Sequence, residues 1–231
     1  MVLEEDIAYS SFLPVSNDNN GFYYDSRYVT DNEIESFDAN KNPLQIRLRN
    51  KTQSLVWDHD YLLATAVNTP VSDIAATSFE SNAKGNWTYS GTTSTDNSAP
   101  TGSKIYSLSG GAVTKSQLDP GKQYIVSYWS KNGQQNAGGA VTIGLSLNGW
   151  TYYEHLVTPA SGTVTVSGSG LIDELRLYPK GALMSTYTYL PLIGMQTQCD
   201  ANNRISYYEY DGFGRLVLIK DQDKNVLKKI C

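Results

Sequence analysis

Short stretches of the chain alternate between apolar and polar residues, and this two-residue period predicts β-strands. The clearest runs are residues 122–129, 152–157, 162–167 and 171–178. The first run follows Asp119-Pro120-Gly121, which predicts a tight turn because Pro fixes φ and Gly accepts a positive φ. No window keeps apolar residues at helical spacing for three turns. The pattern therefore predicts an all-β protein.

The turn-forming residues divide the chain into three zones. Residues 1–70 are polar and rich in Asn and Asp, residues 71–182 hold many short strands between Gly, Ser, Thr and Asn turns, and residues 183–231 are rich in Tyr. The strand spacing of the middle zone is typical of a sandwich or jelly roll. We expect a jelly-roll-like β-sandwich at 71–182, flanked by hairpin segments at 1–70 and 183–231.

A short repeat marks both flanking zones. Four segments begin with Asp and continue with turn-forming residues: 38–42, 200–204, 211–215 and 221–225. The last three begin eleven and ten residues apart, which is the length of one strand and one turn. The Asp side chain can accept backbone N–H groups, and Gly or Asn tolerates a left-handed residue. One such hairpin cannot bury its aromatic side chains alone, so the repeat predicts a stack that continues in further units.

The C-terminal copy has a recognisable pattern. Tyr210-Asp211, followed by Gly214-Arg215-Leu216 and a second Asp turn at residue 221, closely resembles the YD repeat of RHS-family proteins. Residues 36–42 resemble a degraded copy, with Phe37 in place of Tyr and Lys41 in place of Gly. In that family the repeats wind into a β-sheet shell, which encloses a toxin in some members and presents adhesive surfaces in others. The resemblance implies a secreted or cell-surface bacterial protein, with further YD repeats of the parent chain as partners.

The middle zone is similar to carbohydrate-binding modules with a galactose-binding-like jelly roll. The similarity rests on four landmarks in order: residues 78–80, 85–87, 118–129 and 171–177. In those modules an early Phe-Glu and a late Ile-Asp often help to hold a structural calcium ion, which implies Glu80 and Asp173 as ligands here. Calcium takes six to eight oxygens, so backbone carbonyls and loops would supply the rest. The alternative is that both carboxylates are solvated charges on edge strands.

Aromatic residues of the middle zone are candidates for a sugar platform, because sugar rings stack their C–H faces on aromatic rings. The candidates are Trp87, Trp150, Tyr152 and Tyr153. Period-two alternation places Trp150 and Tyr152 on one strand face. Polar contacts to hydroxyl groups would come from Asn148, Glu154 and Arg176. The alternative is core packing, which is favoured for Trp129 because it lies inside an alternating strand.

Charge and missing motifs exclude several functions. The net charge is −5 and no Lys/Arg stripe occurs, which argues against nucleic acid and anionic membranes as partners. No apolar run is long enough to span a membrane, and the first residues, MVLEEDIAYSS, lack the features of a signal peptide. Zinc-type Cys/His spacing, a Gly-x-Ser-x-Gly elbow and phosphate or dinucleotide fingerprints are all missing. Whether Cys199 and Cys231 pair is left open.

The sequence thus favours a non-catalytic structural and interaction segment of a large RHS-like surface or secreted protein, with the sandwich as an accessory module. A carbohydrate-binding module that recognises a glycan through aromatic side chains is the alternative. A fragment of a glycoside hydrolase is a third hypothesis. Exposed edges of the terminal hairpins predict association between chains.

Overall fold

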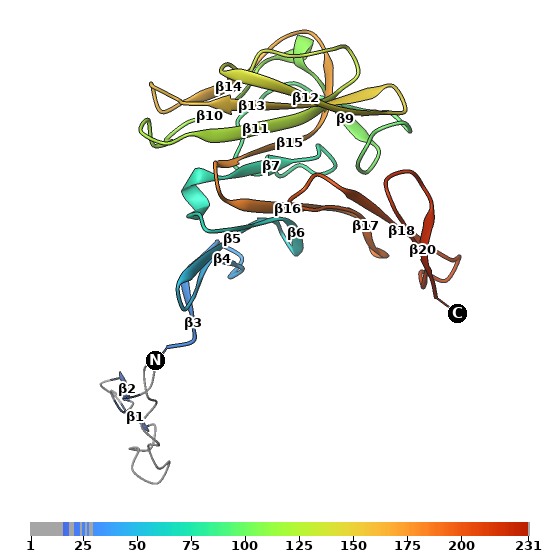
Figure 1. Cartoon of the computed structure of the whole chain (residues 1–231). Coiled ribbons are helices and arrows are strands. Elements are labelled where there is room, and N and C mark those ends of the chain that lie inside the picture. Colours follow the sequence, from blue (N-terminus) through green and yellow to red (C-terminus); the bar gives the residue numbers. More distant parts are fainter. Residues whose placement is uncertain (1–15, 19–20, 24, 26, 28–29, 231) are drawn as a thin grey trace, which may run out of the picture.

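The computed structural model describes residues 16–18, 21–23, 25, 27 and 30–230 (Figure 1). Strands dominate this part of the chain, and its helical turns are two short 3-10 segments, η2 (Val71–Asp73) and η3 (Leu108–Gly110). The predicted all-β class is confirmed. None of the helical segments described is long and apolar enough to cross a bilayer. Cys231 and residues 1–15 lie outside the described residues. The expectation that the first residues are not a signal peptide concerns this part of the chain.

Nine strands from both ends of the chain form one antiparallel sheet, which we call the ribbon. Their spatial order is β20-β19-β18-β17-β16-β6-β5-β4-β3. The N-terminal strands are β3 (Asn32–Phe37), β4 (Pro43–Leu48), β5 (Lys51–Asp58) and β6 (Tyr61–Val67). The C-terminal strands are β16 (Leu183–Leu190), β17 (Gly194–Cys199), β18 (Ile205–Tyr210), β19 (Leu216–Lys220) and β20 (Val226–Lys229). A separate hairpin pairs β1 (Ser16–Asp18) with β2 (Gly21–Tyr23).

The ribbon is continuous in space although the sandwich interrupts it in sequence. Strands β6 and β16 pair directly, with Val67 opposite Leu183 and Ala64 opposite Thr186. The chain therefore leaves the ribbon after β6, builds the sandwich and returns to the neighbouring position. The sequence zones at the two ends, which we expected as separate hairpin segments, form one sheet.

The middle of the chain folds into a lopsided sandwich. Its large sheet has the order β12-β13-β11-β15-β9-β8, with β7 also paired to β15, and its small sheet is β10-β14. The large sheet contains β7 (Ala75–Thr77), β8 (Thr93–Thr95), β9 (Lys104–Ser107), β11 (Tyr124–Ser130), β12 (Ala140–Leu147), β13 (Trp150–Val157) and β15 (Leu171–Pro179). The small sheet contains β10 (Val113–Lys115) and β14 (Val164–Val166).

Alternation along β11 and β15 gives the large sheet two buried faces. Tyr124, Val126 and Leu177 point inward and pack with Val164 and Val166 of the small sheet. The opposite face packs on the ribbon, which lies beneath the sandwich in Figure 1. Two apolar clusters join the modules. One contains Val56, Ala64, Ala66, Ile74, Ala76, Tyr178, Ala182 and Met184, and the other contains Ile105, Trp129, Trp150, Tyr152, Cys199 and Ile205.

The four Asp segments of the sequence repeat form the same turn. In each, the Asp N–H donates to the carbonyl four residues later at 2.9–3.0 Å, and the Asp Oδ1 accepts the N–H groups two and four residues later. The fourth residue of each turn is left-handed: Lys41 (φ 71°), Asn203 (59°), Gly214 (74°) and Lys224 (66°). The repeat in sequence is therefore a repeat of backbone structure.

A buried histidine lies on the inner face of β13. His155 Nδ1 is 2.9 Å from the carbonyl oxygen of Gly138, and its Nε2 is 2.9 Å from the hydroxyl of Tyr128. The Tyr128 hydroxyl also accepts the N–H of Gln135 at 2.8 Å. Burial lowers the pKa of His155 below its ordinary value of 6.5. The core therefore holds the ring neutral and uses it to tie the 135–138 loop to two strands.

Replacing Lys41 with Gly should stabilise the protein, because a side chain at φ 71° is strained and Gly is not. We expect the free energy of unfolding to rise by about 0.5–1 kcal/mol, the left-handed penalty less the entropy that Gly costs. Urea denaturation measures it. The matched control is Lys51→Gly, in strand β5, which should lower stability. Stabilisation by both substitutions, or by neither, would contradict the strain argument.

Stability should depend on pH through His155. Because the folded pKa lies below the unfolded one, the unfolded chain binds the proton more readily, and stability is lost as the pH falls below 6.5. We expect the difference in urea midpoint between wild type and His155→Gln to change with pH between about 7 and 5. His59→Gln serves as the control, since His59 is exposed and its variant should track the wild type. A constant difference across the range would show that His155 does not titrate differently in the two states.

Candidate functional site

The structure places the aromatic candidates for a sugar platform in the core. Trp87 is 3% exposed, Trp150 is fully buried, Tyr152 is 9% exposed and Tyr153 is 7% exposed. Trp150 and Tyr152 do share one face of β13, as alternation predicted, while Tyr153 lies on the other face. Trp87 packs inside the sandwich, apart from that pair. The four rings therefore form no common exposed platform.

The ribbon covers the face on which a platform would have lain. Trp150 and Tyr152 pack with Trp129 against Cys199 of β17 and Ile205 of β18. The Trp150 indole N–H donates to the hydroxyl of Ser98 at 3.1 Å. A sugar ring needs this face open, and strands from a distant part of the chain occupy it. The alternation within β13 predicts which residues share a face, but it does not predict that β17 and β18 cover that face.

The polar candidates are also dispersed. Asn148 is exposed in the tight β12–β13 turn, where its φ is 51°. Glu154 is partly buried, and its carboxylate accepts the hydroxyl of Tyr152 at 3.2 Å. Arg176 is 1% exposed, because the ribbon covers it. These three side chains do not converge on one surface with the aromatic rings.

Arg176 instead joins the two modules. Its Nη2 donates to Asn203 Oδ1 at 2.8 Å and its Nη1 to the carbonyl of Asp200 at 3.2 Å, both in the β17–β18 turn. The Nε is 3.3 Å from the hydroxyl of Ser127 on β11. The planar guanidinium thus bonds its own sheet on one side and the ribbon on the other. A buried charge is tolerated only with such partners.

Two buried carboxylates lie next to this contact. Asp173 Oδ2 accepts the N–H and hydroxyl of Thr101 at 2.9 and 3.1 Å, and Glu174 also accepts the Thr101 hydroxyl and that of Thr186 in β16. Burial and the neighbouring Glu174 raise the pKa of Asp173 well above its ordinary value. Burial raises the pKa of Glu174 as well, although Arg176 opposes it. Both shifts disfavour two neighbouring buried negative charges, and the charge of Arg176 partly offsets this for Glu174.

Glu80 and Asp173, the predicted calcium ligands, meet the same loop. One oxygen of Glu80 accepts the N–H groups of Ser103 and Lys104, and Asp173 accepts that of Thr101. These carboxylates thus receive backbone N–H donors where a calcium site needs a shell of oxygens. Among the residues described, no group of three or more acidic, Cys or His side chains is arranged to hold a metal. Calcium at this loop stays a prediction.

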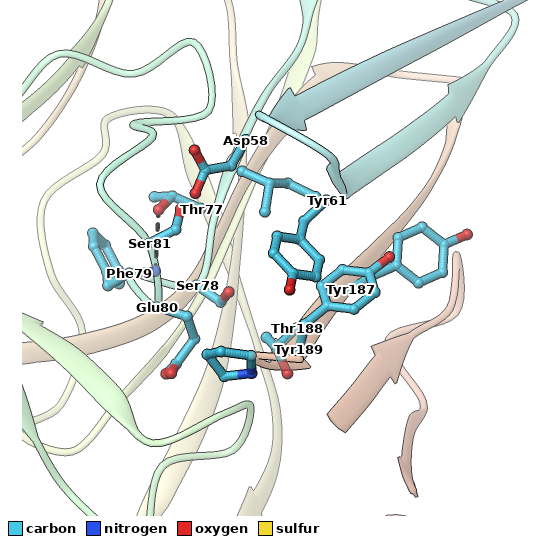
Figure 2. Close-up of a pocket in the computed structure, with 12 residues that line it drawn as sticks. Asp58, Tyr61, Thr77, Ser78, Phe79, Glu80, Ser81, Tyr187, Thr188 and Tyr189 are labelled. Atoms are coloured by element: carbon cyan, nitrogen blue, oxygen red, sulfur yellow. Dashed lines mark hydrogen bonds between the residues drawn. The ribbon is translucent and has the colours of Figure 1, made fainter. Parts of the chain in front are cut away.

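A cavity lies where the ribbon meets the sandwich. It has a volume of about 150 Å³, and Figure 2 shows the residues around it. The β5–β6 hairpin contributes Asp58, Tyr61 and Leu63. The end of β7 and the loop after it contribute Thr77, Ser78, Phe79, Glu80 and Ser81. Strand β16 with its following turn contributes Tyr187, Thr188, Tyr189 and Pro191. Most of the wall is apolar, and three tyrosines provide it. Sequence reasoning missed this site because its walls come from three segments that only the β6–β16 pairing brings together.

The tyrosine rings of this pocket are held in place. The rings of Tyr61 and Tyr189 are 5.0 Å apart and tilted by 42°. The hydroxyl of Tyr61 accepts the N–H of Leu192 at 3.3 Å, and that of Tyr187 is 3.3 Å from the Thr65 hydroxyl. Burial raises the pKa of Tyr189 to about 12, so the ring stays neutral. On the sandwich side of the pocket, Phe79 lies in the left-handed region at φ 62°, and its ring packs on Tyr89 and Tyr106. The pocket thus has an aromatic wall whose rings are held in place by ring contacts and hydrogen bonds.

Removing the guanidinium of Arg176 should destabilise the protein strongly. Arg176→Met fills a similar volume, but it leaves Asn203 and the Asp200 carbonyl without their donor and removes the positive charge that opposes the raised pKa of Glu174. We expect a loss of about 3 kcal/mol in the free energy of unfolding, typical of breaking a buried ionic contact. Urea denaturation at pH 7 measures it.

The control for this variant is Arg204→Met, in the same β17–β18 turn but exposed. It should change stability by less than about 0.5 kcal/mol. Equal losses from both variants would mean that Arg176 does not lock the two modules together.

A scan against protein-family models gives no match for this chain, and a search of curated proteins gives no significant match either.

Proposed function

We propose that this chain is a non-catalytic structural and interaction segment of a larger RHS-like surface or secreted bacterial protein. In this proposal the ribbon is a piece of a longer sheet of YD-type hairpins, and the sandwich is an accessory module seated on it. The observation that carries the proposal is the direct pairing of β6 with β16 across the insertion. A scaffold must keep its sheet unbroken, and a module inserted between two neighbouring strands leaves it so.

The identical Asp turns support the same function. Four of the connections in the ribbon use one hydrogen-bonding scheme, although the copies lie in both halves of the chain. Tyr208 and Tyr210 donate their hydroxyls back to Gln198 and to the Met195 carbonyl of β17. Each hairpin therefore packs on the one before it. Such nearest-neighbour contacts can be repeated without limit.

The two ends of the ribbon support continuation. On β20, Val226 is 56% exposed and Leu227 is 63% exposed, and on β3, Ile34 is 47% exposed and Phe37 is 53% exposed. Both are edge strands of the sheet. Exposed apolar edges are costly in a finished protein and are natural where further strands pair. Edge strand β12 of the sandwich, with Ile143 62% exposed, offers a second apolar surface for an interaction.

Glycan recognition through the predicted aromatic side chains receives less support. Trp150 and Tyr152 are buried under β17 and β18, so stacking on them requires the ribbon to leave the sandwich. Arg176 and the apolar clusters oppose that separation. The scaffold role needs no such rearrangement.

Adding one more repeat should extend the ribbon and stabilise it. We would duplicate residues 205–225 in tandem, so that the new unit presents the same strand–turn–strand–turn pattern before Val226. Pairing and apolar contact with the neighbouring unit should raise the urea midpoint and the strand content. Circular dichroism and urea denaturation measure both.

The matched control is the same duplication with the copied Tyr208 and Tyr210 changed to serine, which keeps the length and turns but removes the contacts to the preceding strand. It should gain less stability than the intact copy. A duplicated segment that is cleaved readily by protease, with an unchanged midpoint, would overturn the proposal of an extendable ribbon.

A further inference from the structure

The pocket between ribbon and sandwich contains a carboxylate without a partner. Asp58 lines it from the β5–β6 hairpin, and Figure 2 shows its carboxylate beside Thr77 and Ser81. Within the described part of the chain, no ion pair or side-chain hydrogen bond involves this carboxylate. The Asp residues of the four repeated turns differ, because each uses its carboxylate to close its own turn. Asp58 occupies a ribbon turn and leaves its charge available.

The second carboxylate of the pocket is already engaged. Glu80 accepts the N–H groups of Ser103 and Lys104, and the Lys104 ammonium donates to the Glu80 backbone carbonyl at 3.1 Å. Asp58 is therefore the pocket carboxylate whose oxygens accept no hydrogen bond from the described residues. The rings of Tyr61, Tyr187 and Tyr189 line the same pocket, and the faces of such rings carry negative electrostatic potential.

We propose that this pocket binds an alkylammonium group, with the cation between Asp58 and the tyrosine rings and its alkyl stem along Leu63. Aromatic rings and a carboxylate together attract a cation, and the attraction grows when the site is partly shielded from water. The apolar wall suits methylene groups and gives a sugar few polar partners. The volume of about 150 Å³ is well below the roughly 300–1,000 Å³ typical of drug-sized ligands, so a compact group fits best.

This inference goes beyond the scaffold role, and its test is separate from that of the extended ribbon. The source of the ammonium is either a small free amine or a lysine side chain of a partner, since both present the same chemistry. The probes are butylammonium, choline and N-acetyl-lysine methylamide, with 1-butanol as the uncharged analogue and methyl glucoside as the sugar. Binding is followed by NMR shifts of the tyrosine rings at constant ionic strength.

We expect butylammonium and choline to shift the signals of Tyr61 and Tyr189, and 1-butanol and methyl glucoside to leave them in place. Binding of the lysine derivative as tightly as butylammonium would point to a peptide side chain as the natural source, and weaker binding to a free amine. Asp58→Asn should weaken butylammonium binding by about tenfold, since it removes a charge-assisted contact. Tyr189→Leu should weaken choline binding in particular, because a quaternary ammonium depends on the rings.

The matched control is Asp60→Asn, an exposed carboxylate two residues away on the same hairpin turn. It should bind butylammonium as the wild type does. Thermal melts establish that each variant is folded. The proposal is overturned if butanol binds as well as butylammonium, if only the sugar binds, if no probe shifts the tyrosine signals, or if Asp58→Asn and Asp60→Asn lose binding equally, since that would reflect general screening of negative charge.

Discussion

The outer face of the large sandwich sheet must be covered, and the rest of the structure depends on how the ribbon covers it. Strands β11, β13 and β15 are apolar on both faces, but the small β10–β14 sheet shields only the inner one. On the outer face Trp129, Trp150 and Tyr152 would otherwise expose large rings to water, at a considerable free-energy cost. The ribbon removes them from water, and Arg176 fixes the register of the contact by reaching the β17–β18 turn. The sandwich and the ribbon are therefore separate sheets in topology, but each depends on the other to bury its apolar side chains.

The same constraint explains why the insertion does not disrupt the ribbon. Because Val67 and Leu183 are opposite each other, the sandwich begins and ends at neighbouring points of one sheet. The buried carboxylates of β15 then bond Thr101 in the sandwich loop and Thr186 in the ribbon. Hydrogen bonds of this kind have direction, which apolar contact lacks, so they select one docking position. Covalent connection, strand pairing and polar contacts all place the modules in the same arrangement.

The sequence predicted the features that depend on local pattern, namely the strands and the turns. The two-residue alternation predicted the strands, and the Asp segments at 200, 211 and 221 predicted turns that prove to share one hydrogen-bonding scheme, with the degraded copy at 38 included. It could not reach contacts between distant segments. Trp150 and Tyr152 were placed correctly on one strand face, but the pattern of β13 does not reveal that β17 and β18 lie on that face. Arg176 was a candidate for a polar contact to sugar hydroxyls, whereas its partners come from a turn 24 to 27 residues away in the chain.

The candidate binding site lies at the junction of the ribbon and the sandwich, where a cavity remains between them. Within the sandwich, the buried apolar residues form one cluster between its two sheets. At the junction, the hairpin turn that begins at Asp58 and the loop in which Phe79 is left-handed line a common recess. Its tyrosines come from the ribbon, and Thr77, Ser78 and Ser81 come from the sandwich, so neither module forms the site alone. A ligand held there would contact both, and would add to the free energy that keeps the accessory module seated on the scaffold.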